Sequence, residues 1–188
     1  PMPACHFTHA AVDAAIRLHA AGIDAKNVES IHVLVPSEVI KTVCEPLQAK
    51  RRPANSYEAQ FSIPYLVATG LLKGRLTLDD IEEPALSDPS VLALCQITTY
   101  AADPNTSFPK YYDGEVIVRF KDGTEQRERE AVNRGAVDRP LTADDIKQKF
   151  RQNAATRLDA ARAMEIEQAV LALDTADASA LNKVLGRT

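Results

Sequence analysis

The sequence has only three cysteines and contains no long hydrophobic run, and each absence excludes a class of protein. Cys5, Cys44 and Cys95 are odd in number and widely spaced, so they suit neither a disulfide framework nor a zinc site. This cysteine usage is typical of a reducing compartment, and we expect the protein in the cytoplasm. No stretch has the pattern of a secretory leader or a bilayer span, so we expect no membrane partner.

Positive charge is also scarce, with 22 Lys and Arg against 26 Asp and Glu and a net charge of −4. The longest basic run is Lys50-Arg51-Arg52, which argues against nucleic acid as the main partner. Walker, dinucleotide and G-x-S-x-G patterns are missing as well. The 188 residues suffice for one large domain or for one domain with an extension.

Apolar periodicity and turn signals predict an α+β fold in which a small sheet packs with helices. The predicted elements are a helix over 8–21, a strand over 28–35, a loop over 45–57, an apolar helix over 62–73, a short helix from 77, a helix over 89–97, a short strand within 96–102 and a hairpin over 115–120 and 124–131. Helices and strands do not alternate regularly, which favours α+β over a repeating βαβ series.

From Pro140 onwards the pattern predicts helices alone. One helix begins near Leu141, a long amphipathic helix covers 158–173, and a final turn covers 181–185. We therefore expect an α+β domain over 1–136 and an all-helical C-terminal segment over 137–188. The first residues run into a helix signal without an initiator Met, which suggests a chain that begins inside a larger protein.

The densest cluster of reactive side chains is CHFTH, residues 5–9. With Thr8 as N-cap, His9 lies in the first helical turn, where the helix dipole keeps its imidazole neutral and able to exchange a proton. A simpler alternative is a structural histidine that hydrogen-bonds at the helix end. Only Cys5, His6 and His9 lie close together in sequence, so we expect no metal site.

A second cluster opens the apolar helix within EAQFSIPYLVATGLLKG, residues 58–74. Ser62 is a good N-cap, and Pro64 occupies the first turn, where its missing N–H costs nothing. Tyr65 adds a phenol at the entrance of a helix that is apolar on nearly every face. The free N–H groups of the first turn favour an anion such as a carboxylate, although an ordinary core helix has the same pattern.

Glu58, Gln60 and Ser62 surround Tyr65 in this second cluster. A buried tyrosine acts as a general acid when a neighbouring cation lowers its pKa, and the basic run over 50–52 offers such a cation. The same basic run also fits an ordinary solvated loop.

Two further features have structural interpretations. Arg127-Glu128-Arg129-Glu130 alternates in sign along a predicted strand, which is typical of an exposed face or a protected edge. Cys44 and Cys95 lie among apolar residues, and we expect both to be buried and inert.

Taken together, these motifs resemble the C-terminal half of the MmgE/PrpD family, which includes 2-methylcitrate dehydratase, cis-aconitate decarboxylase and iminodisuccinate epimerase. The matching pieces are MPACHFTHAAVDAA, EAQFSIPYLVATGLLKG, the Asp88-Pro89 helix start, and VIVRFKDG followed by a Gly and by Pro-Leu before KF. The resemblance implies a two-domain enzyme whose active site lies between a helical domain and this α+β domain.

By this resemblance, Tyr65 corresponds to the family's active-site tyrosine and His9 to the histidine of its Thr-His pair, so both are expected to be catalytic. Ser62, His6 and Gln60 are expected to bind substrate. The family's catalytic lysine would precede Pro1, and other site residues belong to a helical N-terminal half that is not in this sequence.

The resemblance further implies a lyase or isomerase, 2-methylcitrate dehydratase-like and linked to propionate catabolism, that acts on a small di- or tricarboxylate. It implies no metal or cofactor and a homo-oligomer, a dimer. The chain alone would be inactive and would need the missing helical domain or a partner chain. The alternatives are a non-catalytic fragment or partner subunit, and a small-molecule-binding regulatory domain.

Overall fold

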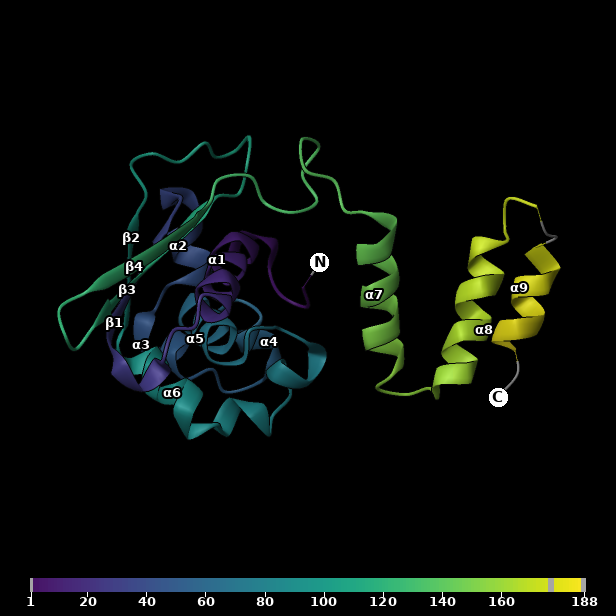
Figure 1. The fold of residues 1–188 in the computed structure, drawn as a ribbon, viewed down its shortest axis with the longest axis horizontal. Coiled ribbons are helices and arrows are strands. Elements are labelled where there is room, and N and C mark those ends of the chain that lie inside the picture. The colour runs from purple at the N-terminus through teal and green to yellow at the C-terminus, as the bar shows by residue number, and fades with distance from the viewer. Residues whose placement is uncertain (1, 176–177, 187–188) are drawn as a thin grey trace. The chain divides into compact units, whose positions relative to one another are not determined.

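The computed structural model describes residues 2–175 and 178–186, and it divides into two compact units, Pro1–Pro140 and Leu141–Thr188 (Figure 1). The first unit combines a four-stranded sheet with helices, and the second contains helices. The predicted α+β class is confirmed. The assignment of 1–136 and 137–188 to two family domains stays a prediction.

The sheet of the first unit has the order β2-β1-β3-β4. Its strands are β1 (Val28–Val35), β2 (Thr98–Ala102), β3 (Gly114–Phe120) and β4 (Glu125–Glu130). β1 pairs with β2 in parallel and with β3 in antiparallel, and β3 and β4 form the predicted hairpin. The parallel pair was not predicted; the helices between β1 and β2 form the long crossover that such a pair needs.

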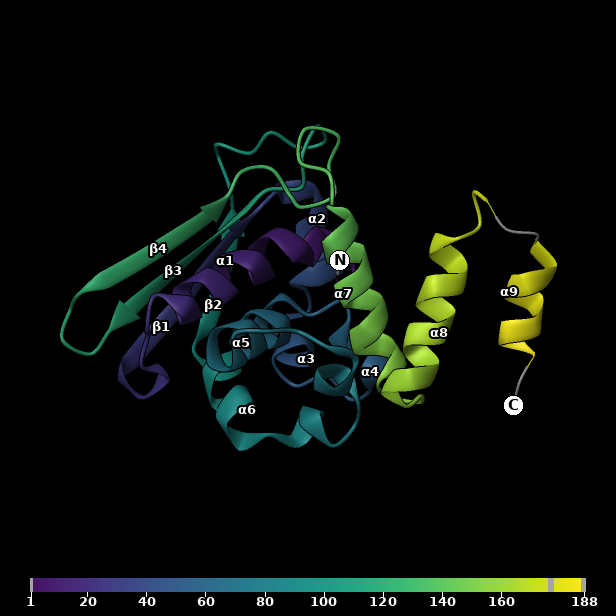
Figure 2. The same cartoon turned by 45° about the vertical axis from the view of Figure 1, so that its right-hand side comes forward.

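Helix α1 (His9–Ala20) contacts β3 and β4 on one side and helix α5 (Ile63–Lys73) on the other (Figure 2). A Cβ added to Gly70 of α5 would lie 3.3 Å from the Ala15 Cβ and 3.3 Å from the Val12 carbonyl oxygen. Glycine at this position therefore allows the close approach of the two helices. The contact brings together the two parts of the chain that carry the predicted site motifs.

The segment between β1 and α5 is more helical than predicted. It contains α2 (Ser37–Val43), α3 (Leu47–Arg51) and α4 (Ser56–Ala59), so the prediction of a loop over 45–57 is wrong. Pro46 is the N-cap residue of α3, and the Asn55 side chain accepts a hydrogen bond from Glu58 N to cap α4. Proline and asparagine begin short helices here instead of ending regular structure.

The other helix boundaries of the first unit follow local signals. Asp88 caps α6 (Pro89–Gln96) and Thr77 forms the predicted capping box with Asp80 at the 3₁₀ helix η3 (Leu78–Ile81). The remaining 3₁₀ turns are η1 (His6–Thr8), η2 (Ala25–Asn27) and η4 (Ala85–Ser87). All members of the buried apolar core lie between Met2 and Phe120.

The second unit contains α7 (Ala143–Ala154), α8 (Ala160–Leu171) and α9 (Ala178–Leu185). A capping box of Thr142 and Asp145 begins α7, and α9 is longer than the predicted turn. Among the described side chains of this unit, only Ala163 is buried. None of the helices within the described residues has the length and apolar character needed to cross a membrane.

Candidate functional site

The two sequence motifs meet at the start of α1. The backbone N–H of Cys5 donates a 2.9 Å hydrogen bond to the carbonyl oxygen of Gln60. Lys50 Nζ donates to the carbonyl oxygen of Phe61 over 2.7 Å, so the end of α3 lies at the same place. Residues more than fifty positions apart in sequence therefore surround one small region of the surface.

His9 lies in the first turn of α1 and is 5% exposed. Its Nε2 is 3.1 Å from the carbonyl oxygen of Ala4. Because a carbonyl can only accept, Nε2 carries the proton and donates. This contact fits the structural alternative, and a catalytic role for His9 stays a prediction.

Thr8 occupies the predicted N-cap position, but it does not cap the helix with its side chain. Its hydroxyl donates to the carbonyl oxygen of Cys5 over 2.7 Å. The 3₁₀ turn η1 before α1 places that carbonyl within reach, so the predicted side-chain cap by Thr8 is wrong.

His6 is exposed, unlike His9. Its ring centroid lies 5.1 Å from that of His9 and 4.7 Å from that of Tyr112, which meets it edge-on. Its Nε2 lies 3.0 Å from Nδ2 of Asn133. Partial burial of the ring lowers the pKa of His6, so the imidazole is largely neutral at pH 7.

Tyr112 and Asn133 were not foreseen from the sequence. Tyr112 lies in the connection between β2 and β3, and Asn133 follows β4. Neither belongs to a motif or a periodic segment. Only the folded sheet, which places the ends of β2, β3 and β4 beside the start of α1, brings them to His6.

Ser62 and Tyr65 lie in the interior. Ser62 Oγ accepts from Tyr65 N over 3.1 Å, which confirms the predicted N-cap of α5. The Tyr65 hydroxyl is fully buried and donates to the carbonyl oxygen of Asp80 over 2.7 Å. In this chain the phenol is therefore occupied by the protein's own backbone.

No cation of the basic run acts on Tyr65 as predicted. Lys50 donates to the carbonyl oxygens of Thr42 and Phe61, and Arg51 donates to that of Thr98. Burial raises the pKa of Tyr65 to about 12, so the lowered pKa that would suit a general acid is not found here. A catalytic role for Tyr65 stays a prediction, and it requires the release of this hydroxyl from its backbone partner.

Gln60 and Lys50 are half-buried at the surface of this region. Within residues 2–175 and 178–186, the Lys50 ammonium uses two of its three N–H groups in hydrogen bonds. Burial lowers the pKa of Lys50, although neighbouring acidic groups act in the opposite direction. His6, Gln60 and Lys50 thus remain accessible to a ligand.

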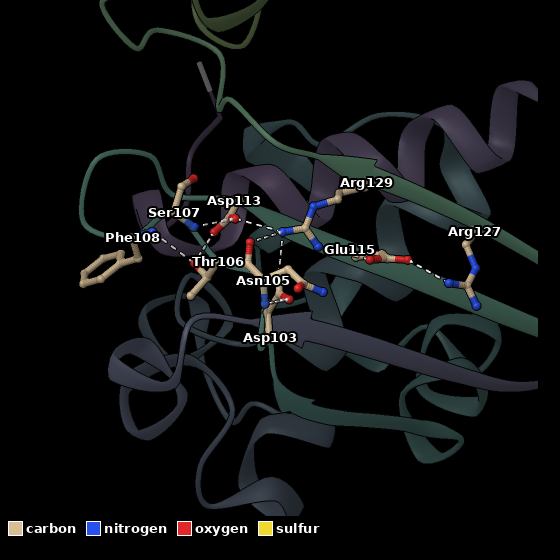
Figure 3. A network of polar contacts seen from close by, with 9 residues as sticks. All are labelled: Asp103, Asn105, Thr106, Ser107, Phe108, Asp113, Glu115, Arg127 and Arg129. Atoms are coloured by element: carbon tan, nitrogen blue, oxygen red, sulfur yellow. Dashed lines mark hydrogen bonds and ion pairs between the residues drawn. The ribbon is translucent and has the colours of Figure 1, made fainter.

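The alternating run of β4 is less exposed than predicted. Arg129 Nη2 lies 2.6 Å from Asp103 Oδ2 and 3.0 Å from Asp113 Oδ2, and its Nη1 lies 3.1 Å from Glu115 (Figure 3). All three carboxylate residues are buried. Of the two predicted alternatives, an exposed face is therefore wrong for Arg129, because this arginine neutralises carboxylates that burial would otherwise isolate, whereas β4 does lie at an edge of the sheet.

This arginine fixes the whole connection between β2 and β3. Asp103 directly follows β2 and Asp113 directly precedes β3, so one guanidinium ties the two ends together. Thr106 and Ser107 add hydrogen bonds to Asp113 (Figure 3). The connection that carries Tyr112 is consequently held in place beside His6.

The grouping and burial of acidic, histidine and cysteine side chains bear on metal binding and on thiol chemistry. In the part of the chain that the structure describes, no three His, Cys, Asp or Glu side chains are grouped to hold a metal ion. Cys44 and Cys95 are fully buried, and burial raises the pKa of each thiol to about 12. Both cysteines are buried as predicted, and their thiols stay protonated at neutral pH.

Comparison of the sequence with known proteins identifies its family. The sequence matches the family described as the MmgE/PrpD C-terminal domain over residues 2–175. A cis-aconitate decarboxylase-like protein of Aspergillus oryzae is 29% identical over 181 residues, covering 92% of this chain and 37% of that protein. Cis-aconitate decarboxylase of Mus musculus is 30% identical over 165 residues, covering 83% of this chain and 32% of that protein.

A 2-methylcitrate dehydratase-like protein of Aspergillus oryzae is 32% identical over 141 residues, covering 69% of this chain and 27% of that protein. The chain therefore spans about a third of the length of these relatives. The chain belongs to the MmgE/PrpD family, of which it carries the C-terminal domain.

Proposed function

We propose that this chain forms the C-terminal part of a lyase or isomerase that acts on a small di- or tricarboxylate by acid–base chemistry. The observation that carries the proposal is the meeting of the two motifs, through Cys5 and Gln60, at the start of α1. The names of the relatives, a decarboxylase and a dehydratase, support a carboxylate substrate.

The accessible side chains suit this chemistry. Removing a proton next to a carboxylate needs groups that hold the carboxylate and groups that exchange the proton. Lys50 and Gln60 offer N–H donors to a carboxylate, and His6 offers a neutral imidazole. Tyr65 and His9 would join only if substrate or a further protein segment displaces their present backbone partners.

These groups form one wall of a site. The relatives are about three times longer than the matched segment, and we propose that a helical region supplies the opposite wall, as part of the same polypeptide or as a partner. Cytoplasmic location, a homodimer and a role in propionate catabolism stay predictions. The second candidate, a non-catalytic partner subunit, is favoured by the exposed apolar side chains of the helical unit.

The test begins with the coding region upstream of Pro1. If it encodes a helical stretch in frame, the longer protein is purified and incubated with cis-aconitate and with 2-methylcitrate, and consumption is followed by proton NMR. We expect consumption of one of them by the longer protein and of neither by the 188-residue chain. A folded longer protein that consumes neither compound would refute this substrate class. A start codon next to Pro1 would favour the partner subunit.

A further inference from the structure

Asn133 is a buried polar residue whose side chain has two partners. It is 3% exposed and lies in the segment that follows β4. Its Oδ1 lies 2.9 Å from the backbone N of Tyr112, and its Nδ2 lies 3.0 Å from Nε2 of His6. The amide therefore bridges a fixed main-chain group and an exposed imidazole.

The chemistry of these partners determines which nitrogen of His6 carries the proton. The N–H of Tyr112 can only donate, so the Asn133 oxygen must face it and the NH₂ group must face His6. An NH₂ group can only donate, so Nε2 of His6 must offer its lone pair. The neutral imidazole then carries its proton on Nδ1.

His9 has the opposite arrangement. Its Nε2 faces the carbonyl oxygen of Ala4 and must carry a proton. Nε2 of His9 thus carries a proton, whereas Nε2 of the neighbouring His6 does not. Two titratable side chains contact the His6 ring in addition to Asn133. They are His9 on α1 and Tyr112, which lies before β3. Within the described residues, no carboxylate, lysine or arginine side chain forms a hydrogen bond or ion pair with this ring, and the charge of the chain's amino terminus acts with burial to lower the pKa of His6.

The segments that carry Tyr112 and Asn133 are both held by ion pairs outside the site. Arg129 ties the connection that carries Tyr112 through Asp103 and Asp113 (Figure 3). The segment of Asn133 is fixed to α1 by its neighbour Arg134, whose guanidinium forms a two-pronged contact with Asp13 at 2.8 and 2.9 Å. The amide cannot rotate to serve a charged His6 without losing the Tyr112 hydrogen bond.

We propose that Asn133 is a positioning residue that keeps His6 neutral, with its proton on Nδ1, so that an Nδ1–H group faces an incoming carboxylate. The use of this N–H rests on the proposed function, whereas the tautomer does not. Asn133 itself contacts His6 and not the substrate.

The first test is nitrogen-15 NMR of the 188-residue chain, with correlations that report which imidazole nitrogen is protonated. Above the titration midpoint of His6 we expect a protonated Nδ1 and an unprotonated Nε2. A proton on Nε2 of neutral His6 overturns the proposal, and this measurement needs no variant.

The second test is Asn133→Asp, which keeps an acceptor for Tyr112 and replaces the NH₂ group by a carboxylate oxygen. A carboxylate favours a protonated Nε2, so we expect the His6 titration midpoint to rise by at least about 1 pH unit. Asn153→Asp makes the same change on the exposed surface of α7 and should leave the midpoint unchanged. An unchanged midpoint in folded Asn133→Asp contradicts the proposal.

Turnover separates this inference from the proposed function. If the longer protein consumes neither carboxylate while His6 carries its proton on Nδ1, the proposed function fails and the role of Asn133 stands. If the longer protein does consume a carboxylate while its neutral His6 is protonated on Nε2, the proposed function stands and the role of Asn133 fails.

Discussion

At the scale of single residues, Tyr65 and His6 have opposite environments. The Tyr65 hydroxyl is fully buried and already bonded to the backbone, whereas the His6 ring is exposed and held at one edge by Asn133. A group that is already satisfied inside the protein contributes to stability, and an accessible group contributes to binding. His6 is therefore the better placed of the two for substrate in this chain.

Removing the buried hydroxyl of Tyr65 tests how much its hydrogen bond contributes to the stability of the fold. Tyr65→Phe leaves the Asp80 carbonyl oxygen without its donor, and we expect the free energy of unfolding to fall by about 1–3 kcal/mol. Urea denaturation of the 188-residue chain measures this change. Tyr57→Phe is the matched control because Tyr57 is 72% exposed, and its effect should be close to zero. Equal stability of the two variants would show that the buried hydrogen bond contributes nothing.

Asp80 gives a prediction about pH. Burial alone would raise the pKa of this carboxyl, but hydrogen bonds from Thr77 and Lys73 outweigh burial and lower it. The unfolded chain thus binds this proton more tightly than the folded one, so the stabilisation is present above about pH 4 and is lost as the pH falls. In Asp80→Asn we expect a smaller loss of unfolding free energy between about pH 5 and pH 2.

Urea denaturation at several pH values measures this effect. Asp79→Asn is the control, since Asp79 is the exposed neighbour in η3 and should retain the wild-type dependence. If Asp80→Asn loses stability on acidification as steeply as the wild type, the ion pair with Lys73 and the capping box do not cause the dependence.

At the scale of elements, local sequence signals determine where helices and strands begin and end, whereas tertiary structure determines which elements pair with one another. The strand over 28–35 and the caps of α5 and α6 were predictable because alternation and capping depend on neighbours in sequence. The parallel β1–β2 pair was not, since its partner lies some sixty residues away. The same reason explains why Tyr112, Arg129 and Asn133 were missed.

The ion pairs of Arg129, which join β4 to the connection between β2 and β3, give a prediction at this scale. Arg129→Gln leaves Asp103 and Asp113 buried without the guanidinium that pairs with them and leaves Glu115 with its longer contact to Arg127. We therefore expect the free energy of unfolding to fall by about 2–4 kcal/mol at pH 7. Arg127→Gln, two residues along the same strand and 62% exposed in its side chain, should cost less than about 1 kcal/mol. Chemical denaturation compares the two; similar losses would contradict a special role for Arg129.

At the scale of the whole molecule, the two units differ in how they bury apolar side chains. The core of the first unit lies within residues 2–120. In the second unit, Ile146, Met164 and Leu171 are each more than half exposed. Exposed apolar side chains of this kind favour the proposal that a further helical region or a partner completes the protein.

Truncation tests whether the first unit is self-sufficient. A chain that ends at Pro140 retains every member of the core, so we expect it to unfold cooperatively in urea with the midpoint of the first unit in the 188-residue chain. Near-ultraviolet circular dichroism follows the tyrosines during this transition. A non-cooperative transition would mean that the helical unit is needed to form the core.

We propose that the start of α1 forms one wall of a carboxylate-processing site in which His6 contacts the substrate. The kcat of the longer protein on its preferred carboxylate, measured for wild type, His6→Ala and His32→Ala, tests it most directly. His32 is a matched control because its imidazole bonds Thr99 on the sheet, away from the α1 start. We predict that His6→Ala lowers kcat by about 100-fold or more, because it removes an N–H donor to the substrate carboxylate, and that His32→Ala leaves kcat unchanged. Equal kcat values for His6→Ala and wild type would contradict the claim.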